Sequence, residues 1–167
     1  MSIKKISFIS IFTTLALIMS YIEMQIPNFI MIPGVKLGLA NIVIIVVLYK
    51  YGLTESVIIN SLRIVIINTI FGSIVSFIYA FVGGFFSLFV MFFFKKCNKF
   101  SYIFVSVLGG VSHNIGQIIV AVIITNTKEI LYYLPVLLIF GIISGVIIGI
   151  LSAVILKKLH YKFNFNN

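Results

Sequence analysis

The chain has 167 residues, of which 62% are hydrophobic and 9% are charged, and its mean hydropathy is +1.27. About half of the residues of a soluble domain are apolar and about a quarter are charged, so this composition excludes a soluble globular protein. The net charge of +9 does not indicate nucleic-acid binding, because the basic residues separate apolar runs instead of forming one basic face. We predict one all-α integral membrane domain over residues 1–167.

Six apolar runs follow one another, and a bilayer core of about 30 Å takes about 20 helical residues. Bounded by charged residues, glycines and prolines, the runs predict a six-helix transmembrane bundle with helices at residues 5–24, 37–51, 54–72, 74–94, 100–125 and 130–158. Lys4 and Lys5 before the first run resemble the start of a signal peptide, but no small-residue cleavage pattern follows. Pro27, Pro33 and Gly34 predict a non-helical connection after the first helix.

The basic residues predict the orientation of the bundle. Alternate ends of the six helices receive nine and two lysines, the nine being Lys4, Lys5, Lys50, Lys95, Lys96, Lys99, Lys157, Lys158 and Lys162 and the two being Lys36 and Lys128. Cytoplasmic loops carry the excess of basic residues, so we expect both termini in the cytoplasm and a multi-pass protein of a bacterial cytoplasmic membrane. The single cysteine, Cys97, lies among lysines and excludes an internal disulfide.

Small residues recur every four positions in the last helix, at Gly141, Gly145, Gly149 and Ala153. This spacing places them on one helix face, where small residues let two helix backbones approach closely. We therefore expect this face to pack against another helix, without a chemical role.

Arg63 is the most costly residue in the apolar runs. An arginine at the centre of a transmembrane helix costs about 2.5–3.5 kcal/mol on an insertion scale, so its helix should turn this side chain inward. Asn60, three residues before it, lies on the same face, and Asn68 lies closer to the predicted outer end. Further polar groups occur at compatible depths in other segments, at Lys36 and Asn41 and at His113, Asn114 and Gln117.

Together these residues predict a cavity that opens outward and binds a small molecule. The predicted binding residues are Lys36, Asn41, Arg63, Asn68, His113, Asn114 and Gln117. Lys and Arg suit a carboxylate or phosphate, Asn and Gln both donate and accept hydrogen bonds, and His changes charge near neutral pH. We expect no carboxylate at the depth of Arg63, whose partner is then a ligand anion, a backbone carbonyl or Glu23 through a bent first helix. Arg63, His113 and the asparagines could instead brace helices.

The residues that are missing argue against catalysis by this chain alone. It contains no aspartate and three scattered glutamates, so no acidic cluster is available to hold Mg²⁺ against a diphosphate. Two histidines and one cysteine do not make a zinc site, and no phosphate-binding loop occurs. We predict no catalytic residue, no metal, no cofactor and no nucleic-acid partner.

Four motifs carry a family resemblance. "PGVKLGLANI" at 33–42, "SLRIVIINTIFG" at 61–72, "GGFFSLFVM" at 83–91 and "GGVSHNIGQIIVA" at 109–121 resemble the family labelled heptaprenyl diphosphate synthase component I (Gx transporter family). The resemblance runs from about residue 6 to 156. This family is related to the substrate-binding S components of energy-coupling factor (ECF) transporters, which are six-helix membrane proteins of this size.

The resemblance to S components implies a subunit that captures a vitamin or precursor from outside and docks on a transmembrane coupling subunit with two ATPases. S components dock through small residues of the first helix, and the nearest match here is Ala16 and Ser20. The synthase label implies an accessory membrane subunit of a prenyl-chain elongating enzyme. We expect an S component, with the accessory subunit and a purely structural membrane protein as alternatives.

Overall fold

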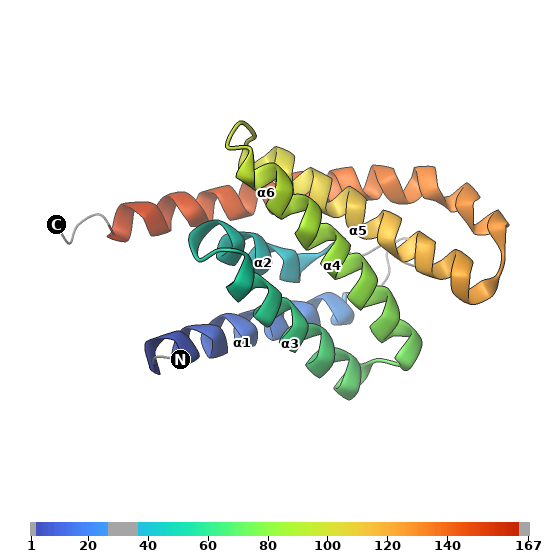
Figure 1. The fold of residues 1–167 in the computed structure, drawn as a ribbon, viewed down its shortest axis with the longest axis horizontal. Coiled ribbons are helices and arrows are strands. Elements are labelled where there is room, and N and C mark those ends of the chain that lie inside the picture. Colours follow the sequence, from blue (N-terminus) through green and yellow to red (C-terminus); the bar gives the residue numbers. More distant parts are fainter. Residues whose placement is uncertain (1–2, 27–36, 164–167) are drawn as a thin grey trace.

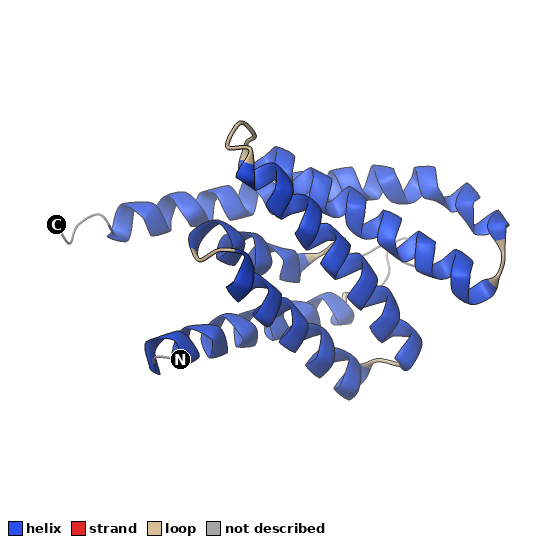
Figure 2. Ribbon diagram, in the orientation of Figure 1, coloured by secondary structure: helices blue, strands red, loops and turns tan. Residues whose placement is uncertain are grey.

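A computed structural model of the protein describes residues 3–26 and 37–163. No strand occurs among these residues, and their regular elements are all helices (Figure 2). In chain order they are α1 (Ile3–Gln25), α2 (Leu39–Lys50), α3 (Leu53–Phe71), α4 (Ile74–Lys96), α5 (Tyr102–Thr125), the 3₁₀ helix η1 (Lys128–Tyr133) and α6 (Leu134–Phe163). The predicted connection around Pro27, Pro33 and Gly34 lies outside the described residues.

The predicted helices agree with α1 to α5 within two residues at each end. The last helix differs, since the sequence predicts one helix over 130–158 and the structure has η1 followed by α6. Pro135 lies in the first turn of α6, where its missing N–H and fixed backbone angle are tolerated. The α-helix therefore begins at Leu134, and it continues to Phe163 because nothing in the tail interrupts it.

Five helices are long and apolar enough to cross a membrane, namely α1, α3, α4, α5 and the η1–α6 segment. The expectation of six spanning helices is met only in part, because α2 has 12 residues and spans about 18 Å. That length is below the bilayer core of about 30 Å. Every residue from Ile42 to Leu48 is buried, and α2 contacts α1, α3, α4 and α6. The chain is thus a multi-pass membrane protein built around a short, enclosed helix.

The two longest helices, α5 and α6, run antiparallel side by side, and α4 packs on the other side of α5 (Figure 1). Glycines allow this close approach. A Cβ atom on Gly110 would lie 2.4 Å from the Gly141 carbonyl oxygen, and one on Gly145 would lie 2.6 Å from the Val107 Cα atom. A Cβ atom on Gly149 would lie 2.7 Å from the Ile103 Cα atom. The small-residue face predicted in the last helix is therefore confirmed as a packing face.

The lysines that the sequence assigns to one side gather at one end of the bundle. The Lys5 ammonium group lies 2.7 Å from the Glu55 carboxylate, which joins the starts of α1 and α3. Lys50 donates to the Leu159 carbonyl oxygen at 3.3 Å, and Lys95 donates to the Leu48 carbonyl oxygen. These contacts bring the ends of α2, α4 and α6 to the start of α1, at the left of Figure 1. We call this region the basic end, and its cytoplasmic orientation stays a prediction.

The packing of α5 on α6 leads to a first prediction. Gly145→Ala places a methyl group where the α5 backbone lies, so the helices must separate and the folded state loses about 1–3 kcal/mol. This loss exceeds the gain in helix propensity of up to about 1 kcal/mol. We expect a lower Tm in detergent micelles. The control, Val154→Ile, enlarges a side chain that is 47% exposed on the same helix and should leave the Tm unchanged; an unchanged Tm for Gly145→Ala would contradict the packing account.

Candidate ligand-binding cavity

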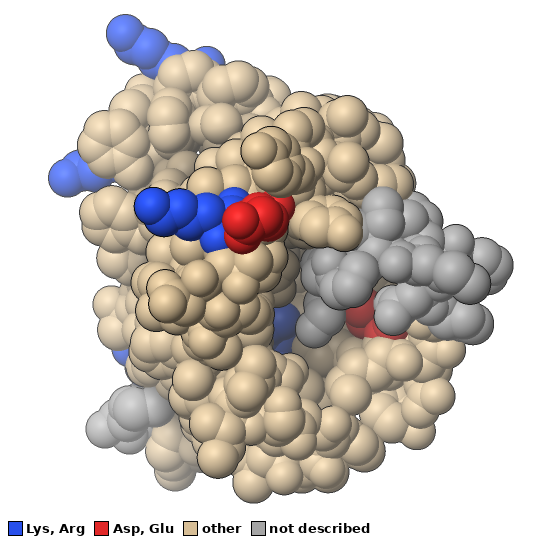
Figure 3. Space-filling model, turned by 90° about the vertical axis from the view of Figure 1, so that its right-hand side faces the viewer, with Lys and Arg blue, Asp and Glu red and all other residues tan. Residues whose placement is uncertain are grey.

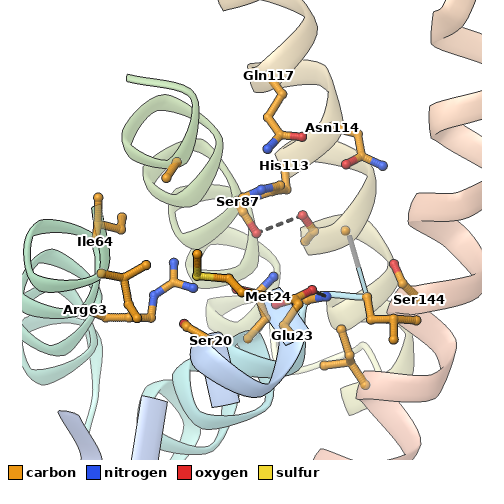
Figure 4. Close-up of a pocket in the computed structure, with 18 of the residues that line it drawn as sticks. Ser20, Glu23, Met24, Arg63, Ile64, Ser87, His113, Asn114, Gln117 and Ser144 are labelled. Atoms are coloured by element: carbon orange, nitrogen blue, oxygen red, sulfur yellow. Dashed lines mark hydrogen bonds between the residues drawn. The ribbon is translucent and has the colours of Figure 1, made fainter. Parts of the chain in front are cut away.

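A cavity of about 710 Å³ lies inside the bundle, and all six α-helices contribute to its wall (Figure 4). Its lining includes residues near the end of α1, the end of α3 and the start of α4, all of which lie away from the basic end. Figure 3 views that side of the molecule and shows a hollow with a basic side chain inside it. The lining also includes Met91 near the end of α4 and Ser106 near the start of α5, so the cavity extends from the half away from the basic end toward that end.

Arg63 projects from α3 into this cavity (Figure 4). One guanidinium nitrogen, Nη2, donates to Asn60 Oδ1 at 2.9 Å, and Asn60 is almost wholly buried. The Arg63 Nε atom is also buried and has no hydrogen-bond partner among the described residues. An unsatisfied buried donor on a partly buried cation is costly, so the arrangement favours a ligand group that accepts a hydrogen bond from Arg63.

Glu23 lies on the facing wall, near the end of α1 (Figure 4). Its carboxylate accepts a hydrogen bond from the Gly38 backbone N–H. Gly38 precedes α2 with φ of +75°, a left-handed conformation that glycine adopts without strain. Glu23 is one of the three partners that the sequence leaves open for Arg63, and its carboxylate lies on the wall of the same cavity.

The polar residues of α5 are divided between two tasks. Asn114 Nδ2 donates to the Leu137 carbonyl oxygen of α6 at 2.6 Å, so this amide links the two helices. His113 and Gln117 lie four residues apart and line the cavity. The Gln117 Oε1 atom is buried without a hydrogen-bond partner in the part of the chain that the structure describes. Gln117 thus offers an acceptor to a ligand, whereas one donor of Asn114 is already used.

Glycines make room for this face of α5. A Cβ atom on Gly83 of α4 would lie 3.1 Å from His113 Cε1 and 3.1 Å from Gln117 Cγ. A Cβ atom on Gly109 would lie 2.6 Å from the Met91 sulfur. The glycines around the histidine block therefore set how closely α4 approaches α5, and with it the width of the cavity.

Asn41 and Asn68 also line the cavity, as the sequence predicts. Asn68 Nδ2 donates to the Ile64 carbonyl oxygen one turn earlier at 2.8 Å, which leaves its carbonyl oxygen as the group that a ligand could use. Asn41 lies in the first turn of α2, close behind Gly38. Six of the seven predicted binding residues are thus brought to one cavity, and the seventh, Lys36, lies outside the described residues.

The predicted docking residues of α1 do not lie on an open surface. Ala16 is fully buried and Ser20 is 7% exposed, and Ser20 also lines the cavity. α1 packs on α2 and α3, so its small residues are used within this chain and are enclosed by it. Their position gives no support to docking of a coupling subunit at these two residues.

Several lining residues are not identifiable from the sequence pattern. They are the hydroxyl and thioether side chains of Ser20, Met24, Ser76, Ser87, Met91, Ser106 and Ser144. Ser87 Oγ donates to the Gly109 carbonyl oxygen at 2.8 Å and so links α4 to α5. Serine and methionine are ordinary residues of transmembrane helices, and only their small size near glycines could have indicated a cavity.

The described wall offers hydrogen-bonding groups within an apolar enclosure. Within residues 3–26 and 37–163 there is no group of three His, Cys, Asp or Glu side chains placed to hold a metal ion. One guanidinium, one carboxylate, one imidazole and several amides instead provide hydrogen bonds in an apolar enclosure. A cavity of this size, mostly apolar and with a few converging polar groups, is typical of a small-molecule site.

The comparisons with known proteins give the family. No curated protein and no solved structure matches the chain. A family model described as heptaprenyl diphosphate synthase component I matches residues 12–155. Since this match spans most of the 167 residues, the chain belongs to the heptaprenyl diphosphate synthase component I family.

Proposed function

We propose that the chain is a non-catalytic membrane subunit that binds one small polar molecule in the cavity. The observation that carries this proposal is the partly satisfied Arg63, whose Nη2 is held by Asn60 and whose buried Nε has no hydrogen-bond partner among the described residues. An arginine that only braces helices is not stabilised when one of its N–H donors has no hydrogen bond beside a cavity. The amides of Asn41, Asn68 and Gln117 on other walls support the same function.

The family name favours an accessory subunit of a prenyl diphosphate synthase. In this setting the chain would serve a catalytic partner as component I, because it has no aspartate with which to bind the Mg²⁺ ions of chain elongation. Its cavity would then hold a molecule that controls or supplies that partner. We take this as the first candidate for the biological role.

An S component of an ECF importer is the second candidate, and the position of the cavity favours it. Part of its wall, at the ends of α1 and α3, lies away from the basic end, so with the basic end in the cytoplasm this part would face outward, as substrate capture requires. A coupling subunit would then need a docking surface other than Ala16 and Ser20, which are buried.

Arg63→Gln tests ligand binding by the cavity. The substitution removes the charge and should weaken binding about 10- to 150-fold, which corresponds to a charge-assisted hydrogen bond of about 1.5–3 kcal/mol. We expect native mass spectrometry of wild-type protein from its host to show one bound small molecule per chain, and Arg63→Gln to show nearly none. Leu62→Ala is the control: this side chain of the same helix is exposed on the surface of the bundle and does not line the cavity, so the variant should keep the molecule. Full occupancy of Arg63→Gln with a lower Tm would show that Arg63 only braces helices.

The two biological roles separate in a purification and reconstitution experiment. As a synthase component, the tagged chain should co-purify with a soluble prenyl synthase whose rate of chain elongation falls several-fold when the chain is omitted. As an S component, it should co-purify with a membrane subunit and two ATPases and leave the synthase rate unchanged. A synthase rate independent of the chain contradicts the first candidate, and the absence of ATPases contradicts the second.

A further inference from the structure

The lysines of the basic end divide into two groups. Lys5 pairs with Glu55 across the starts of α1 and α3. Lys50 and Lys95 donate to carbonyl oxygens near the ends of α6 and α2. The other lysines of this end whose side chains the structure describes are exposed, and we call them the exposed lysines: Lys96, Lys99, Lys157 and Lys158.

No carboxylate side chain of this protein is available to neutralise the exposed lysines. The chain has no aspartate and three glutamates. Glu55 lies 2.7 Å from the Lys5 ammonium group, Glu23 lines the cavity, and Glu129 lies in η1, at the opposite end of α6 from the basic end. The exposed lysines therefore form a surface with an excess of positive charge.

The exposed lysines continue apolar helix faces on the outside of the bundle. Phe93, which is 59% exposed, lies three residues before Lys96 in α4. Val154, which is 47% exposed, lies three residues before Lys157 and four before Lys158 in α6. Residues three or four apart share a helix face. In a bilayer these ammonium groups therefore lie one helical turn beyond side chains that face the acyl chains, which is the depth of the phospholipid headgroups.

Two of the exposed lysines lie on a projecting end of α6. Its 30 residues extend about 45 Å, which exceeds the bilayer core of about 30 Å. Gly149 packs on Ile103 at the start of α5, so the residues from Lys157 onward lie beyond the start of α5 (Figure 1). Lys50 donates to the Leu159 carbonyl oxygen at 3.3 Å and so ties this end of α6 to the end of α2. The lysines of α6 are thus carried by an ordered helix end.

We propose that the exposed lysines bind the phosphate groups of anionic phospholipids and so hold the basic end at a negatively charged membrane surface. An ammonium group binds phosphate as a point charge, and each basic side chain near an anionic bilayer strengthens binding roughly fivefold. A soluble acidic protein would match the charge too, but the continuity of these lysines with apolar outer faces favours lipid. This role does not depend on a ligand in the cavity.

Native mass spectrometry of the full-length protein in detergent tests this proposal with two added lipids. Dioleoyl phosphatidylglycerol is anionic, and dioleoyl phosphatidylcholine has the same acyl chains without a net charge. Wild type should retain about tenfold more of the anionic lipid. The paired variants Lys96→Gln with Lys99→Gln and Lys157→Gln with Lys158→Gln should each reduce this preference several-fold, because each removes two exposed positive charges. Either pair leaves seven of the nine lysines predicted for this side, so insertion and Tm should be unchanged.

Two controls separate charge from position. Lys157→Arg with Lys158→Arg keeps both charges and should keep the preference for the anionic lipid. Lys128→Gln removes an exposed charge from η1, at the opposite end of α6, and should also leave the preference unchanged. Equal retention of the two lipids by wild type, as expected of a surface that serves an acidic protein, would overturn the proposal. An undiminished preference in both paired glutamine variants would overturn it as well.

Discussion

The structure depends on how an apolar bundle accommodates one partly buried guanidinium, that of Arg63. Arg63 lies within a membrane-spanning helix, where a cation is stable only if polar groups replace its water. Asn60 on the same helix supplies one acceptor, and the rest of the guanidinium faces a cavity instead of lipid. The cavity, with the polar groups on its wall and the carboxylate of Glu23, provides this polar surrounding.

The same bundle must be rigid enough to keep that cavity open. Helices α5 and α6 meet at Gly110, Gly141 and Gly145 with backbones in contact, and Asn114 adds a hydrogen bond between them. This rigid pair frees the neighbouring face of α5, with His113 and Gln117, to line the cavity. Packing against α6 and lining of the cavity thus both draw on α5, which explains why polar and small residues alternate so closely in residues 109–117.

Much of this arrangement is predictable from the sequence, because the bilayer makes polar residues and glycines conspicuous. Helix periodicity places Asn60 beside Arg63, and the four-residue glycine spacing identifies the packing face of α6. The direction in which an amide points is not predictable, so the use of Asn114 to link helices emerges only from the structure. The position of Glu23 is not predictable either, since it depends on where α1 ends and on the turn at Gly38. The burial of Ala16 and Ser20 depends on which helix packs on α1, and a single sequence does not specify this.

The central claim is that a bound small molecule completes the hydrogen bonds of Arg63. An experimental structure of the protein purified from its host tests it most directly. The account predicts non-protein density in the cavity with one group within hydrogen-bond distance of the Arg63 guanidinium. A cavity that holds only water, or that closes so that protein groups satisfy Arg63 completely, would contradict it.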